Sequence, residues 1–111
     1  MTVTVKVLIP AKIAEATQTT QYTANGVTTI IDKFTATNYS ASAATLSVNL
    51  VTVSFSAGDA NLITKTKTLQ PAEVYTFPEL VGQVLAPSGF ISTLAGTATS
   101  INIRASGREV S

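Results

Sequence analysis

Hydroxyl side chains are the most abundant groups in this sequence that could take part in chemistry. The 111 residues include 19 Thr and 10 Ser, but no His and no Cys. A hydroxyl becomes a nucleophile only when a general base removes its proton, and His is the commonest base. Lys can replace His in that role, but no Ser-x-x-Lys spacing occurs. We therefore expect the hydroxyls to line the polar faces of strands rather than to catalyse hydrolysis.

Carboxylates and metal ligands are equally sparse. A glycosidase needs two converging carboxylates, and Glu73 and Glu79 are the nearest pair that flanks a candidate groove. Each is better explained as a charge at the end of a strand or the start of a helix. Asp59-x-Asn61 resembles the start of a calcium loop, but the distal bidentate Glu does not follow. The sequence predicts a turn there, and no catalytic residue, metal or cofactor.

The charge distribution narrows the range of partners. Seven basic and six acidic residues are scattered singly, and charged residues make up 12% of the chain, against roughly 25% in an average domain. No Lys/Arg cluster indicates nucleic-acid binding, and no apolar run approaches the roughly 18 to 20 residues that span a bilayer. Outward positions rich in Thr, Ser, Asn and Ala suit contact with other proteins, because burying a hydroxyl costs much less than burying a charge. We therefore expect this protein to work inside an assembly.

The composition predicts that the chain consists of short strands. Val, Ile and Thr together make up 38 of the 111 residues, and β-branched side chains favour strands over helices. About eight strands are expected, separated by polar turns. The apolar alternation places them at residues 2–9, 18–24, 27–38, 45–55, 62–69, 73–77, 90–95 and 99–105.

Several local signals refine this pattern. Pro10 is expected to end the first strand, and Asn25-Gly26 predicts a hairpin turn. The change of phase at Leu50-Val51 indicates a β-bulge, or a strand whose halves serve different cores. Pro at a first helical position followed by Glu predicts one short helix over Pro78–Leu85. Residues 106–111 read as a polar tail.

The expected fold is therefore all-β, an antiparallel β-sandwich or jelly roll in a single globular domain. Residues 1–16 form an N-terminal strand or arm, and residues 17–111 form the sandwich. The candidate interface residues are the apolar positions of the first strand and the one aromatic residue expected to be exposed in a turn: Val3, Val5, Val7, Ile9 and Tyr39.

The middle of the chain resembles a known group of proteins. The segment from Tyr22-Thr23-Ala24 through Asn25-Gly26 to Ile30-Ile31, a strand ending in Thr37-Asn38 and the run Ala44-Thr45-Leu46 follow one another in order. Pro87-Ser88-Gly89-Phe90 and the closing Ser106-Gly107-Arg108-Glu109 continue the pattern. This order resembles the small β-sandwich virion proteins of tailed bacteriophages, over about residues 18 to 111.

The resemblance implies a structural role. Such proteins are capsid cement or decoration proteins, head fibres or small tail components, and none of these roles needs a catalytic residue. It implies that this chain, made in the host cytoplasm, lies on the outer capsid surface, where it binds the major capsid protein and copies of itself as a dimer or trimer. The alternative is a tail, fibre or baseplate component that binds other tail proteins or a host glycan. Grouped exposed aromatic residues would favour that alternative, and an enzyme is the remote third possibility.

Overall fold

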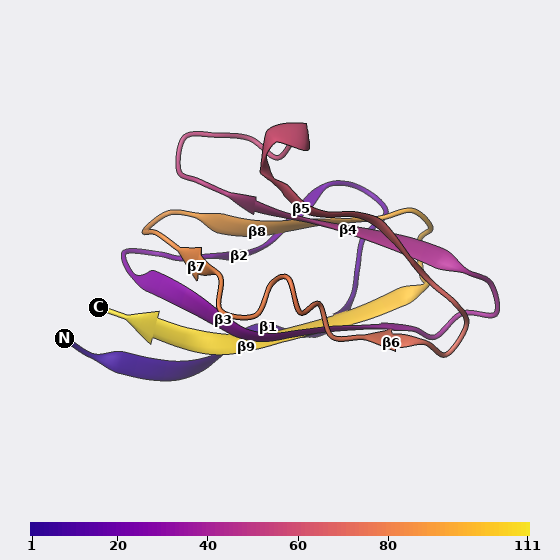
Figure 1. Cartoon of the computed structure of the whole chain (residues 1–111), viewed down its shortest axis with the longest axis horizontal. Coiled ribbons are helices and arrows are strands. Elements are labelled where there is room, and N and C mark those ends of the chain that lie inside the picture. The colour runs from indigo at the N-terminus through magenta and orange to yellow at the C-terminus, as the bar shows by residue number, and fades with distance from the viewer.

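Two antiparallel sheets packed face to face make up the chain in the computed structural model, which describes residues 1–111 (Figure 1). The first sheet has the strand order β1 (Val3–Ile13), β9 (Ile101–Val110), β3 (Thr28–Asn38) and β6 (Val74–Tyr75), and β7 (Val84–Leu85) also pairs with β3. The second sheet has the order β2 (Thr19–Thr23), β8 (Phe90–Ala95), β4 (Ala44–Val51) and β5 (Leu62–Leu69). The predicted antiparallel sandwich is confirmed, with nine strands rather than about eight. The structure contains no helix with the length and hydropathy needed to span a bilayer.

The core lies between the two sheets and is built from alternate residues of their strands. Phe34 of β3 and Phe77, which follows β6, are fully buried, with ring centroids 4.9 Å apart in an edge-to-face arrangement. Leu46 of β4 and Ile91 of β8 meet them from the second sheet as members of the same cluster. Every buried side-chain polar atom has a hydrogen-bond partner. The buried polar side chains are therefore accommodated without an unpaired side-chain donor or acceptor.

The first strand is longer than predicted, because Pro10 does not end it. β1 continues to Ile13, and its pairing with β9 shifts register between Val7 and Ile9 and again between Ile9 and Lys12. Proline is tolerated in a sheet at an edge strand or a bulge, where its missing N–H is not needed for pairing. β1 is an edge strand, and Pro10 lies within the second shift, between Ile9 and Lys12. The bulges therefore absorb the residue that was expected to break the strand.

The Asn25-Gly26 turn does not form a hairpin. Gly26 has the positive φ of 68° expected of a turn glycine. The strands on either side belong to different sheets, however, because β2 pairs with β8 while β3 pairs with β9. The turn therefore carries the chain from one sheet to the other.

The helix predicted over Pro78–Leu85 is absent. Residues 78–83 form turns, and Val84–Leu85 pair with β3 as β7. Leu80 and Leu85 are both buried, and a spacing of five residues would place them on different sides of a helix. Gly82 has a φ of 84°, which also interrupts a right-handed helix. The only helical turn is η1 (Asp59–Asn61), in the loop between β4 and β5.

The observed ends of β4 and β9 also differ from the predicted ones. β4 stops at Val51, and Val53 and Phe55 lie exposed in the following loop. The C-terminal segment is not a tail, because β9 runs to Val110 between β1 and β3. The glycine at position 107 is required by close packing, because an added Cβ would lie 2.2 Å from the carbonyl oxygen of Ile30. A central strand can therefore contain residues that pattern reading assigns to a tail.

Candidate interaction surface

The first half of β1 carries a row of exposed valines. Val3, Val5 and Val7 lie opposite Val110, Arg108 and Ser106 of β9, and residues directly opposite in an antiparallel pair share a face of the sheet. In β9 the intervening residues Ala105 and Gly107 are buried. The three valines therefore point away from the second sheet, and Val5 is 84% exposed.

Other strands extend this apolar row across the outer face of the first sheet. Val5 lies opposite Arg108, Arg108 opposite Ile30 of β3, and Ile30 opposite Val84 of β7. Val84 is also exposed, and Ile30 is partly exposed. One row of outward side chains therefore runs over four strands, with apolar residues at three of its four positions.

The single charge in that row is neutralised within the molecule. The Arg108 guanidinium donates to both carboxylate oxygens of Asp32, from Nε at 3.0 Å and from Nη2 at 2.9 Å. These hydrogen bonds lower the pKa of the Asp32 carboxyl and raise that of Arg108. Asp32 is the extra residue where the β3–β9 register shifts between Ile31 and Lys33, and this bulge turns its carboxylate outward. The charge of Arg108 is thus balanced by Asp32 of the same chain, and the rest of the row consists of valines and an isoleucine.

Two of the predicted interface residues do not join this surface. Ile9 does not share the face of the valines, because the bulge after Val7 turns it into the core, where it is fully buried. Tyr39 is half exposed, but it follows the end of β3 that pairs with Ile101, whereas Val3 lies beside Val110 at the other end. Ten residues of strand separate these ends, about 33 Å. Only Val3, Val5 and Val7 come together.

The two carboxylates considered for catalysis have separate structural partners. Glu73 accepts a hydrogen bond from the backbone N–H of Gln70 at 2.7 Å, within a turn. Glu79 accepts from the hydroxyls of Thr64 and Tyr75. Burial acts to raise the pKa of Glu79, but these hydrogen bonds outweigh it and the pKa is lowered. A glycosidase acid needs the opposite shift, so this environment favours a structural anion.

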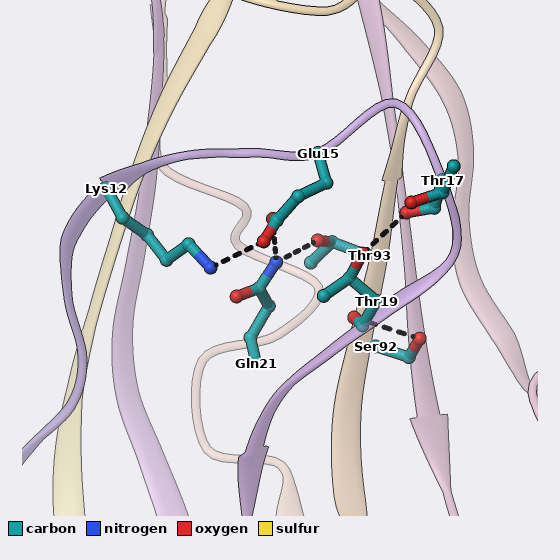
Figure 2. A network of polar contacts seen from close by, with 7 residues as sticks. All are labelled: Lys12, Glu15, Thr17, Thr19, Gln21, Ser92 and Thr93. Atoms are coloured by element: carbon teal, nitrogen blue, oxygen red, sulfur yellow. Dashed lines mark hydrogen bonds and ion pairs between the residues drawn. The ribbon is translucent and has the colours of Figure 1, made fainter.

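A polar network ties the edge of the first sheet to the second (Figure 2). Lys12 Nζ lies 2.9 Å from Glu15 Oε2, and Gln21 Nε2 donates to Glu15 Oε1 at 2.8 Å and to Thr93 Oγ1 at 2.9 Å. The backbone of Glu15 also accepts from Ala95 at 3.0 Å. The hydrogen bond from Lys12 is the main reason that the pKa of Glu15 is lowered. The network fixes the crossing segment between β1 and β2, and the hydroxyl of Thr93 accepts a hydrogen bond from the Gln21 amide.

The Asp59-x-Asn61 segment folds as the turn that the sequence predicts. Asn61 Oδ1 accepts from Gly58 N at 3.0 Å and from Asn49 Nδ2 at 2.7 Å, so the loop itself uses this oxygen. Nowhere in the structure do three His, Cys, Asp or Glu residues gather as a metal site. A groove beside this turn has a volume of about 180 Å³, below the roughly 300 Å³ at which small-molecule pockets begin.

The outer face therefore contains residues that the sequence did not reveal as a group. Ile30, Val84, Arg108 and Asp32 come from three strands and meet only through the pairing register. The one local signal was Asp32, an acidic residue that interrupts the alternation of β3. Searches against protein-family models, curated proteins and solved structures find no match to this chain.

Proposed function

We propose that this protein is a structural component of a larger protein assembly, which it joins through the outer face of its first sheet. The observation that carries the proposal is the row of exposed valines on β1, continued by Ile30 and Val84. Exposed apolar surface that is contiguous across several strands is typical of interaction sites, whereas single exposed apolar residues are ordinary.

The composition of the remaining surface supports the same proposal. Charged residues make up 12% of the chain, and depletion of charge distinguishes the centres of protein interfaces from other surfaces. The ion pair of Arg108 with Asp32 leaves no uncompensated charge in the valine row. A partner that covers Val5, Ile30 and Val84 therefore desolvates no isolated charge among them, which would be costly.

The sequence resemblance gives the assembly its proposed identity, the capsid of a tailed bacteriophage. As a cement protein, the chain would sit across junctions between coat subunits and make contacts that only the mature lattice offers. A ligand that binds one state selectively stabilises that state, by about 2.7 kcal/mol for each site at a hundred times its Kd. Many weakly bound copies would together reinforce a shell under pressure from packaged DNA.

The position of the exposed aromatic residues favours the head over a glycan-binding tail role. Tyr39 and Phe55 are the two exposed aromatic side chains. Tyr39 precedes β4 and Phe55 follows it, so they flank opposite ends of an eight-residue strand. That strand is about 26 Å long, which is too far for one sugar-binding platform.

The test uses heads of the phage proposed to carry this chain, assembled with its gene deleted. Purified wild-type chain is expected to co-sediment with the heads and to raise the temperature at which they release DNA. Val5→Asp places a charge in the middle of the row and is expected to abolish both effects. Val53→Asp is the matched control, since Val53 is an exposed valine in a loop of the second sheet. Equal binding by Val5→Asp and wild type, or binding confined to tails, would reject the proposal.

A further inference from the structure

The first half of β1 has an open backbone edge as well as an exposed face. Thr2 and Ser111 exchange two backbone hydrogen bonds of 2.9 Å, which makes them a hydrogen-bonded pair of the β1–β9 ladder. In an antiparallel ladder such pairs alternate along the strand. Thr4 and Lys6 therefore face β9, while Val3, Val5 and Val7 direct their N–H and C=O groups to the empty side of β1.

The other sheet edges carry several protecting features, whereas this one carries only Lys6. β6 and β7 have two residues each, and β2 shifts register between Thr20 and Tyr22. β5 carries Lys65 and Lys67 and two register shifts. Short strands, lysines and bulges are devices that prevent edge-to-edge pairing. In β1 the proline, Lys12 and both shifts lie after Val7, so Val3–Val7 pairs without a break and offers a regular free edge.

We propose that this edge pairs with the same edge of a second copy of the chain, antiparallel about a two-fold axis through Val5. Val5 then lies opposite Val5 of the second copy, and Val3 opposite its Val7. All three residues already point their backbone groups to the free edge, so the pairing forms six N–H···O bonds. The valine row is thus self-complementary, as a two-fold interface requires.

The charges near the edge disfavour the neighbouring register centred on Lys6. Moving the pairing by one step toward Lys6 would place Lys6 directly opposite Lys6 of the second copy, which is destabilising. With the axis at Val5, Lys6 lies opposite Thr4 of the second copy, which in turn lies opposite that copy's Glu109. Lys6 already contacts its own Glu109 at 3.2 Å. Each Lys6 is then flanked by the Glu109 carboxylates of both copies, so the charges are complementary across the axis.

Residues 2–7 are exposed throughout, so no part of the fold obstructs the approach of a second copy. The joined sheets would also place two valine rows side by side on one outer face. The inference deepens the proposed function, because it rests on a chain built for assembly and names one partner. It does not depend on the capsid, since two copies can pair in free solution.

Cysteine cross-linking tests the register directly, because the natural chain has no Cys. Opposed residues in a hydrogen-bonded pair have Cα atoms about 5.5 Å apart, a distance that a disulfide spans. Under mild oxidation, Val5→Cys is expected to form a covalent dimer at least ~10-fold faster than Val74→Cys, an exposed valine of β6 at the far edge of the same sheet. Val3→Cys is expected to react as slowly as the control, because two copies of Val3 would be about 13 Å apart.

Sedimentation of the full chain measures the dimer itself. Wild type is expected to reach twice its 11.5 kDa mass, and Val5→Lys to weaken dimerisation by at least ~10-fold, while Val74→Lys remains dimeric. A monomer at all concentrations, a dimer unaffected by Val5→Lys, or no preference for cross-linking at Val5 would overturn the inference. Capsid binding by a chain that stays monomeric would reject the pairing and leave the proposed function standing; a dimer that binds no particle would do the reverse.

Discussion

The two halves of β1 have similar residues and opposite environments. Residues 2–7 are exposed on both faces and pair regularly with β9, whereas Leu8 and Ile9 are buried and the residues that follow contain two register shifts. Proline, Lys12 and the bulges protect the edge of the second half. The first half has none of these features except Lys6.

The difference shows how one strand can serve the fold with one part and remain available to a partner with the other. A bulge inserts one residue and reverses the side to which the following residues point. Here it turns the alternation from Val7, which faces outward, to Ile9, which faces the core. We therefore expect substitutions before the bulge to affect association, and substitutions after it to affect the free energy of unfolding.

The largest effect on stability is expected in the buried half. Ile9→Ala removes apolar atoms from a fully buried site, and such changes reduce the free energy of unfolding by about 2–5 kcal/mol. Urea denaturation followed by circular dichroism measures the loss. Val5→Ala is the matched control in the exposed half, where the expected change is within about 0.5 kcal/mol. Equal losses at the two positions would contradict the difference in burial.

A smaller loss of stability is expected for a substitution at Gly107 of β9, the strand that lies between β1 and β3. In Gly107→Ala the new Cβ would lie 2.2 Å from the Ile30 carbonyl oxygen and 2.9 Å from Leu8 Cδ1. The backbone contact cannot be relieved by a side-chain rotation, so we expect about 1–3 kcal/mol of destabilisation. The same denaturation experiment measures it, and Ser106→Ala, at the adjacent outward-facing position, is expected to change little. Unaltered stability of Gly107→Ala would show that β3 and β9 can separate locally without loss.

The alternation of residues predicted much of the fold. It predicted β5 and β8 at their observed bounds. It failed where tertiary contacts decide the conformation. The Asn25-Gly26 turn connects two sheets because Tyr22 and Ile31 are both buried in the core from opposite sides, and no local rule distinguishes this from a hairpin.

The interaction surface was predictable only within a single strand. Val3, Val5 and Val7 share a face by simple alternation, but Ile9 leaves it at a bulge that the sequence does not mark. Ile30 and Val84 lie 25 or more residues from Val5 along the chain, and they join the row only through pairing between strands. A register of this kind depends on long-range contacts, which one sequence without its structure does not specify.

The exposed half of β1 is expected to affect assembly rather than folding. Val5→Asp replaces a residue that is 84% exposed, so the free energy of unfolding should change by no more than about 0.5 kcal/mol. Association, measured by sedimentation and by particle binding, is expected to be lost. Deletion of residues 1–6 should give the same result, whereas deletion through Ile9 would also remove two core residues. Strong destabilisation by Val5→Asp would show that this half is needed for the fold itself.

The smallest expected effect is on the pH dependence of stability, and it concerns Glu109 of β9, which lies opposite Thr4 in the exposed half of β1. The hydrogen bond from the Tyr22 hydroxyl, aided by Lys6, holds the pKa of Glu109 below its ordinary value of 4.5, although burial acts in the opposite direction. A carboxyl whose pKa is lowered by folding stabilises the folded state above its unfolded pKa, and that contribution is lost as the pH falls through the folded pKa. Glu109→Gln should therefore be slightly less stable than wild type at pH 7, and the difference should disappear well below pH 4.5. Tyr22→Phe removes the main cause of the shift and should remove most of this pH dependence, so an undiminished dependence in Tyr22→Phe would place its origin elsewhere.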